Sequence, residues 1–180
     1  MTCELAASSG AHVLDPERLP DHLDRLYSAA WALCGSRQDA EDLVQDTYDR
    51  VLRRPRIVRG DADGDIYYLL RALRNTFFSQ RRAAARRPRS ADVALDELAL
   101  PDTSSDAADP PAAIEAREVY AVIAALPDEY RDALVAIDVA GLSYREAARL
   151  LRVREGTITS RVYRARGRVA ESIRGAHAAR

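Results

Sequence analysis

The sequence LSYREAA at residues 142–148, followed by GTITSRVYRAR at 156–166, decides how this chain folds. Ser143 can cap a helix, and Glu146 three residues later completes a capping box. Ala147, Leu150 and Leu151 supply an apolar stripe in the first segment. The second segment repeats apolar residues at the spacing of one helix face, at Ile158, Val162, Ala165 and Val169. The pattern predicts two short helices joined by a tight turn, which is a helix-turn-helix.

The remaining positions of the second helix carry hydroxyl groups, a phenol and guanidinium groups. Such side chains reach phosphates and base edges in a DNA major groove. The candidate duplex-contacting residues are Thr159, Ser160, Arg161, Tyr163, Arg164 and Arg168.

The net charge of −1 hides a strong alternation of charge along the chain. Residues 1–49 hold ten acidic residues and three Arg, whereas residues 50–90 hold twelve Arg and three acidic residues. Residues 91–128 are acidic again, and residues 129–180 hold eleven Arg against six acidic residues. Two separate cationic segments therefore predict nucleic-acid contact at two places.

An amphipathic helix is predicted after Ser36, ending before Pro55. Its apolar face differs sharply from an exposed face that is acidic at the start and basic at the end. One interpretation is a solvated helix whose charges suit the helix dipole. The other is a docking face, with the candidate residues Glu41, Asp42, Gln45, Asp46 and Asp49.

A further helix from Ile66 carries aromatic and basic residues opposite a complete aliphatic face. Aromatic rings interleaved with Arg suit unpaired bases, which stack on the rings while Arg holds the backbone. The alternative is that Tyr67 and Phe78 belong to the core. The candidate residues for an opened strand are Tyr67, Tyr68, Arg71, Arg74, Asn75 and Phe78.

These elements predict an all-α protein of two helical domains joined by a flexible acidic linker. The expected divisions are a disordered N-terminus at 1–18, a helical domain at 19–87, the linker at 88–112, a helix-turn-helix domain at 113–175 and a tail at 176–180. The linker is rich in Pro, Asp and Ser and lacks apolar periodicity.

The sequence argues against several other classes of protein. Cys3 and Cys34 are the only cysteines and there are three His, so no disulfide framework or zinc spacing is visible. No nucleophile–base pair or phosphate loop is present, so we expect neither an enzyme nor a cofactor. No segment approaches 18 apolar residues, so we expect a cytoplasmic protein without membrane insertion.

Four strings, in this order, resemble the extracytoplasmic-function (ECF) sigma factors of bacterial RNA polymerase. They are DAEDLVQDTY at 39–48, YLLRALRN at 68–75, LPDEYR at 126–131 with GLSYREAA at 141–148, and the second helix described above. The resemblance covers about residues 20–173.

The resemblance implies roles for these segments. The acidic face would dock on the largest subunit of core RNA polymerase, and the second basic helix, from Thr157 to Arg168, would recognise the −35 promoter element. The helix at 66–78 would hold the melted −10 strand, and the preceding loop with Arg59, Gly60 and Asp61 would accept a flipped base. Members of this family are commonly inhibited by an anti-sigma factor, so the resemblance also implies such a partner.

Some residues depart from the family pattern. Arg152 occupies the tight turn where the family usually has Gly, and Thr159 stands where Lys or Arg is common. The function expected is a sigma factor that directs promoter-specific initiation and aids melting. The alternative is a stand-alone helix-turn-helix regulator, which needs duplex contacts only.

Overall fold

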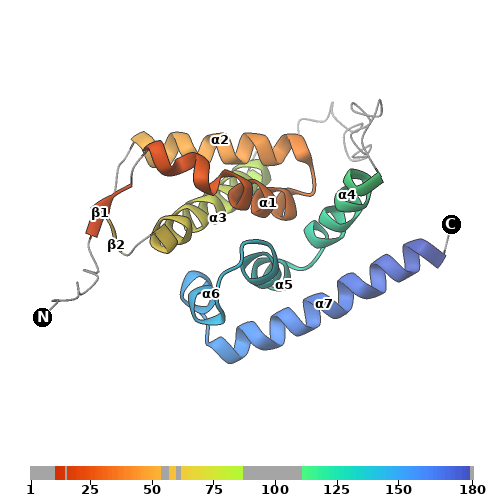
Figure 1. Ribbon diagram of the computed structural model, residues 1–180. Helices are drawn as coiled ribbons and strands as arrows, with labels where there is room; N and C mark the ends of the chain where they lie inside the picture. Colours follow the sequence, from red (N-terminus) through yellow and green to blue (C-terminus); the bar gives the residue numbers. More distant parts are fainter. Residues whose placement is uncertain (1–10, 15, 54–56, 60–61, 87–110, 179–180) are drawn as a thin grey trace, which may run out of the picture.

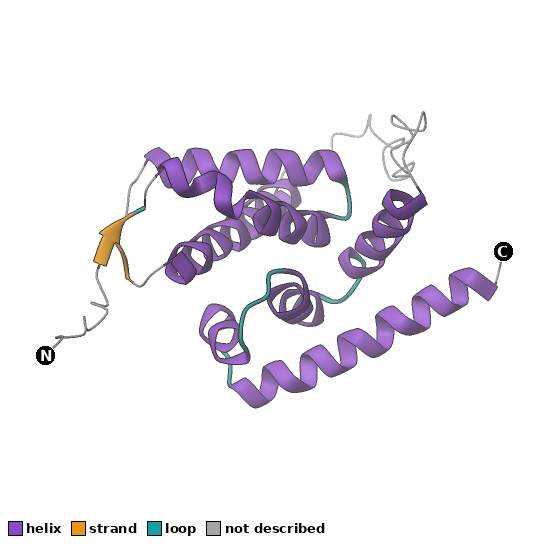
Figure 2. Ribbon diagram, in the orientation of Figure 1, coloured by secondary structure: helices purple, strands orange, loops and turns teal. Residues whose placement is uncertain are grey.

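The computed structural model describes residues 11–14, 16–53, 57–59, 62–86 and 111–178. Helices dominate the described chain, as Figure 2 shows. The N-terminal domain contains η1 (Pro16–His22), α1 (Leu23–Cys34), α2 (Arg37–Arg53) and α3 (Ala62–Arg86). The C-terminal domain contains α4 (Pro111–Ala124), α5 (Asp128–Leu134), the π-helical turn η2 (Val135–Val139), α6 (Tyr144–Leu151) and α7 (Glu155–Ala178). The predicted all-α architecture of two domains is confirmed.

The predicted apolar faces form the core of each domain. In α2 and α3 the fully buried large side chains include Leu43, Ile66, Leu69 and Leu73. In the helix-turn-helix, Ile158 and Val162 are buried against α5 and α6, together with Ala147 and Ala165. Leu150, Leu151 and Val169 are only half-buried. The helical periodicity therefore identified most of the core.

A short antiparallel ribbon was not predicted. Strand β1 (Ala11–Val13) pairs with β2 (Ile57–Arg59), so that Ala11 lies opposite Arg59. The prediction of disorder over residues 1–18 is therefore wrong for the described residues from 11 onward. The physical reason is burial: Leu14 and Leu19 join the core, and the Tyr48 hydroxyl donates to the Leu19 carbonyl at 3.2 Å.

The predicted boundaries of the linker and the C-terminal tail lie closer to those of the structure. Helix α4 begins at Pro111, at the end of the expected linker, and α7 continues to Ala178 into the expected tail. The remainder of the linker, residues 88–110, lies outside the described residues, as do Gly60 and Asp61.

The two domains pack directly on each other, which the sequence did not indicate. Helix α1 contacts α4, α5 and η2 in addition to α2 and α3, and α3 also contacts α6 (Figure 1). Ala29, Ala30 and Ala32 of α1 are completely buried. Small side chains such as these allow neighbouring helices to approach closely. The buried residues of the two domains form one continuous hydrophobic cluster.

Gly35 is required by this packing as well as by the turn after α1. Its φ of 78° is left-handed, and its N–H donates to the Trp31 carbonyl at 2.7 Å. A Cβ at this position would lie 2.8 Å from the Cβ of Ala124 in α4. Trp31 also lies against Tyr120 of α4, with ring centroids 4.7 Å apart. The end of α1 is therefore shaped to receive α4.

The start and end of α6 set the helix-turn-helix geometry. The Ser143 hydroxyl accepts from the Glu146 N–H at 3.3 Å, and the Ser143 N–H donates to the Glu146 carboxylate at 2.8 Å. This is the predicted capping box. Arg152 ends the helix with φ 57° and ψ 44°, so the tight turn is left-handed. For a residue other than glycine this conformation costs roughly 1 kcal/mol or more.

We expect Ser143→Ala to lower the free energy of unfolding by about 1 kcal/mol, because an N-cap side chain satisfies an otherwise free backbone N–H. Ser143→Asn, which can also cap, should stay close to wild type. Urea unfolding followed by circular dichroism measures both. Equal stability of the wild type and Ser143→Ala would contradict a stabilising cap.

The contribution of Glu146 to this cap should depend on pH. Hydrogen bonds from the Ser143 hydroxyl and N–H hold the pKa of Glu146 below its ordinary 4.5. The folded state therefore binds fewer protons than the unfolded state just below pH 4.5. The stabilisation is complete above pH 4.5 and is lost as the pH falls through the lower folded-state pKa.

Candidate nucleic-acid interfaces

The exposed face of α7 is the first candidate interface. Tyr163 is 81% exposed, and Thr159, Ser160 and Arg164 are also exposed. Arg166 donates two hydrogen bonds to the Asp138 carboxylate, at 2.9 and 2.6 Å. This bidentate pair helps to hold α7 against the end of η2. The exposed face of α7 therefore belongs to a helix that is held in place by its buried apolar side and by the Arg166–Asp138 pair.

Not all predicted residues of α7 are equally available. Arg161 is only 24% exposed and pairs with Glu129 at 2.9 Å, while Arg168 lies 5.0 Å from the centre of the Tyr130 ring. Thr157 is half-buried, and the hydroxyls of Thr159 and Ser160 donate to backbone carbonyls of their own helix. Arg164 and Tyr163 are thus the residues of this face best placed to reach a partner.

The second candidate interface lies on α3. Arg71 and Asn75 are exposed, whereas Tyr67, Tyr68 and Phe78 are half-buried and pack against the core. The Arg74 guanidinium lies 4.7 Å from the centre of the Phe78 ring. Each ring therefore contributes to the core and keeps an exposed part, and stacking of unpaired bases on these rings stays a prediction.

The loop before α3 is described only in part. Arg59 ends β2, but Gly60 and Asp61 lie outside the described residues, so the predicted base pocket has no described geometry. Asp65, at the start of α3, is completely buried, and Arg18 of η1 approaches its carboxylate at 3.8 Å.

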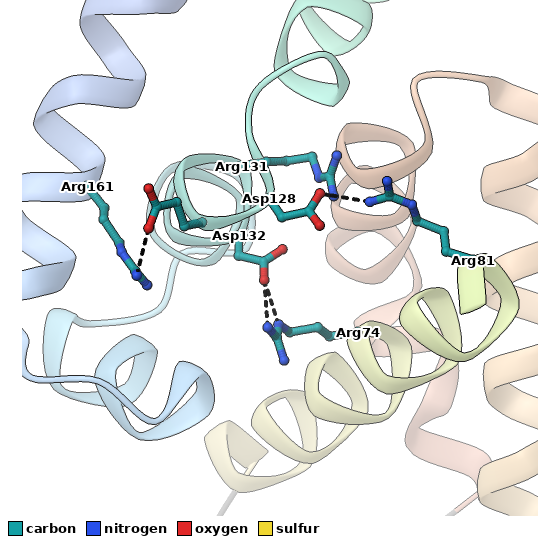
Figure 3. A network of polar contacts seen from close by, with 7 residues as sticks. Arg74, Arg81, Asp128, Arg131, Asp132 and Arg161 are labelled. Atoms are coloured by element: carbon teal, nitrogen blue, oxygen red, sulfur yellow. Dashed lines mark hydrogen bonds and ion pairs between the residues drawn. The ribbon is translucent and has the colours of Figure 1, made fainter. Parts of the chain in front are cut away.

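Arg74 is occupied by an ion pair between the domains, as Figure 3 shows. Its Nε and Nη2 donate to the Asp132 carboxylate at 2.8 and 2.7 Å. The Asp132 side chain is 5% exposed and that of Arg74 is 32% exposed. Burial raises the pKa of Asp132, and Arg74 and Arg131 oppose this effect without cancelling it. A predicted DNA-contacting cation therefore neutralises a buried carboxylate.

A second ion-pair cluster joins the same two helices. Asp128 accepts from Arg81 of α3 at 2.7 Å and from Arg131 at 2.6 Å (Figure 3). Burial alone would raise the pKa of Asp128, but the hydrogen bonds and charges of the two guanidinium groups hold it below its usual value. Arg131 and Arg81 also lie 5.2 and 5.6 Å from the centre of the Phe77 ring.

The acidic face of α2 is exposed along its length. Asp42 and Gln45 are exposed, and Asp46 accepts a hydrogen bond from Gln80 of α3 at 2.8 Å. Glu41 and Asp49 form exposed i,i+4 pairs with Arg37 and Arg53, at 3.6 and 3.1 Å. Exposed pairs of this kind contribute little to stability, so the face remains free to meet a cationic partner.

Comparison with known proteins identifies the family. The family model "Sigma-70 region 2" matches residues 20–87, and "Sigma-70, region 4" matches residues 116–169. A relative from Rhodopseudomonas palustris, the ECF RNA polymerase sigma factor EcfG, is 32% identical over 80% of this chain and 76% of its own length. The chain belongs to the ECF sigma factor family.

Two further matches agree with this assignment. The ECF RNA polymerase sigma factor SigE of Mycolicibacterium smegmatis is 34% identical over 83% of this chain, which spans 58% of that relative's length. The solved complex of the sigma factor RpoE with the anti-sigma factor NepR from Bartonella quintana superposes with a TM-score of 0.64 and 28% identity. The match covers 88% of this chain and 95% of that sigma factor chain.

Sequence reasoning missed the residues by which this sigma factor joins its two domains. Asp128 and Asp132 lie one turn apart on α5, and Arg74 and Arg81 lie two turns apart on α3. Because these two separations differ, the spacing along the sequence does not indicate the pairs. Arg25 adds a third link, since its Nη2 donates to the Ala140 carbonyl at 2.6 Å.

No helix in the described part of this sigma factor is both long enough and apolar enough to cross a membrane.

We expect Asp132→Arg to separate the two domains, because it places a second cation against Arg74 in a buried site. The radius of gyration from small-angle X-ray scattering should increase. Asp138→Arg is the matched control, since Asp138 pairs with Arg166 inside the C-terminal domain. An unchanged radius for Asp132→Arg, in a chain that retains its helical circular dichroism, would contradict this role of the pair.

Proposed function

We propose that this chain binds core RNA polymerase and directs it to promoters by contacting DNA through both of its domains. The observation that carries the proposal is the presence of two cationic helix faces, on α3 and α7, in separate domains of an ECF sigma factor. A stand-alone regulator needs the face of α7 only, so it leaves the acidic face of α2 and the α3 face without a role.

The face of α7 is proposed to recognise the −35 element. Arg164 and Tyr163 are exposed at its middle, where a major groove can receive them, and Thr159 and Ser160 lie on the adjacent turn. Arg161 and Arg168 would first have to exchange their intramolecular contacts for phosphates. Since those contacts are exposed or partly exposed, the exchange costs little.

The face of α3 is proposed to hold the opened −10 strand. Arg71 and Asn75 offer donors for the backbone and base edges, and Tyr67, Tyr68 and Phe78 offer ring surface for stacking. Arg74 can join them only after leaving Asp132. Use of the full face therefore requires the two domains to part, and Arg59, Gly60 and Asp61 complete the proposed base pocket.

The acidic face of α2 is proposed to dock on the polymerase. Its exposed carboxylates are arranged along one side of the helix and have few strong partners among the described residues, so a basic surface of the enzyme can pair with them. Binding alone accounts for the proposed activity, and we assign no catalytic role to any described residue. The proposed location is the cytoplasm, where the polymerase acts.

We further propose that an anti-sigma factor inhibits this chain. The support is the match to RpoE, which was solved in complex with the anti-sigma factor NepR.

Asp46→Arg should weaken binding to core polymerase, because it reverses the charge at the centre of the α2 face. Glu171→Arg makes the same charge change on an exposed part of α7 and is the control. Co-purification with core polymerase and fluorescence anisotropy measure the effect. Normal affinity of Asp46→Arg would count against docking through this face.

Arg164→Ala should weaken discrimination for the −35 element by roughly 1–3 kcal/mol if the guanidinium contacts a base. Binding to core polymerase should not change. Arg174→Ala, in an exposed part of α7 farther from the turn, is the control. In-vitro transcription from promoters with altered −35 sequences measures the effect, and unchanged promoter choice would refute base recognition by Arg164.

A further inference from the structure

A cationic cavity lies between the two domains, next to the tight turn of the helix-turn-helix. It has a volume of about 200 Å³ and is bounded by α3 on one side and by the end of α6 with its turn on the other. Its lining residues are Arg71, Arg74, Asn75, Leu150, Leu151 and Arg152. The cavity is composite, so it exists only while the two domains are packed together.

The charge of this cavity is not balanced by the described residues. Arg74 is neutralised by Asp132, but neither Arg71 nor Arg152 forms an ion pair with another described residue. The Asn75 amide likewise has no hydrogen bond to the described chain. Two guanidinium groups and an amide, all on exposed residues, thus line one space without a partner among the described residues. Like charges that share a partly enclosed site favour a bound anion.

The backbone of Arg152 provides an independent observation. This residue has a left-handed φ of 57°, whereas the other positive φ values in the described chain belong to Gly35 and Gly141. A side chain is strained in this conformation and a glycine is not. Backbone strain of this kind is concentrated at functional sites and ligand-binding positions. At this position the side chain lines the cavity, opposite Arg71 and Asn75.

We propose that this cavity binds a phosphate-type oxyanion, either free phosphate or the phosphate of a nucleotide. Guanidinium groups present paired donors that match phosphate oxygens, and an arginine retains its charge at any physiological pH. A water molecule occupies about 30 Å³ in the liquid, so the cavity has room for phosphate and some remaining water. Arg152 contacts the anion from the C-terminal domain, and Arg71 with Asn75 contacts it from the N-terminal domain.

A bound anion bridges the two domains and holds them together. It also occupies two residues that are proposed to hold the −10 strand, so it opposes promoter opening. This consequence rests on the proposed function, whereas binding of the anion does not. The linkage is reciprocal: an anion that binds only the packed form must stabilise that form.

The test is isothermal titration calorimetry of the full chain with sodium phosphate, at an ionic strength held constant with sodium chloride. Adenosine monophosphate, whose phosphate carries about the same charge as free phosphate at pH 8, is titrated in a second arm. We expect saturable binding in at least one arm. If the nucleotide binds at least tenfold more tightly than phosphate, the site recognises a nucleotide; otherwise it recognises free phosphate.

The informative variant is Arg152→Gly, which removes the guanidinium and relieves the backbone strain, so it should fold at least as well as the wild type. We expect its dissociation constant for the anion to rise at least tenfold. Arg154→Ala removes an exposed cation two residues away that does not line the cavity, and it should bind like the wild type.

Three results would overturn the proposal: no saturable binding in either arm, undiminished binding by Arg152→Gly, or an equal loss in Arg154→Ala. Neither polymerase nor DNA is present in the titration. A failure here therefore leaves the proposed sigma activity standing, and a failure of promoter recognition leaves the anion site standing.

Discussion

The ion pair between Arg74 and Asp132 is the interaction on which the arrangement of the two domains depends. A carboxylate that is 5% exposed needs a partner, and the pair is found across the domain boundary. Around it, the buried alanines of α1 and the close approach of Gly35 to α4 let the apolar surfaces meet. A second pair between the same two helices, Asp128 with Arg81, lies one turn away on α5 and two turns away on α3.

The same pair connects the fold to the function of a sigma factor. Arg74 lies on the face that is proposed to hold the opened promoter strand, yet in this structure it neutralises Asp132 and lies against Phe78. The contact of Arg74 with the C-terminal domain therefore competes with its proposed contact with DNA. DNA that takes the full proposed face of α3 would require the two domains to separate, because Arg74 must first leave Asp132.

The sequence predicted the features that depend on neighbours along the chain. The capping box of Ser143 and the apolar faces of α2, α3 and α7 all follow from local spacing. It did not predict that Arg74 meets a residue 58 positions away, because an exposed-looking arginine suits DNA and a distant carboxylate equally well. The β1–β2 ribbon was missed for the same reason, since strands of three residues carry almost no periodicity.

The distance between spin labels at Arg82 of α3 and Ala170 of α7, both exposed, tests the account most directly. Electron–electron double resonance should give one narrow distance in the free chain, because the ion pairs and the shared core fix the two domains. Addition of core polymerase should replace it with a longer distance. A broad distribution in the free chain, unchanged by the polymerase, would contradict the packed arrangement and its opening.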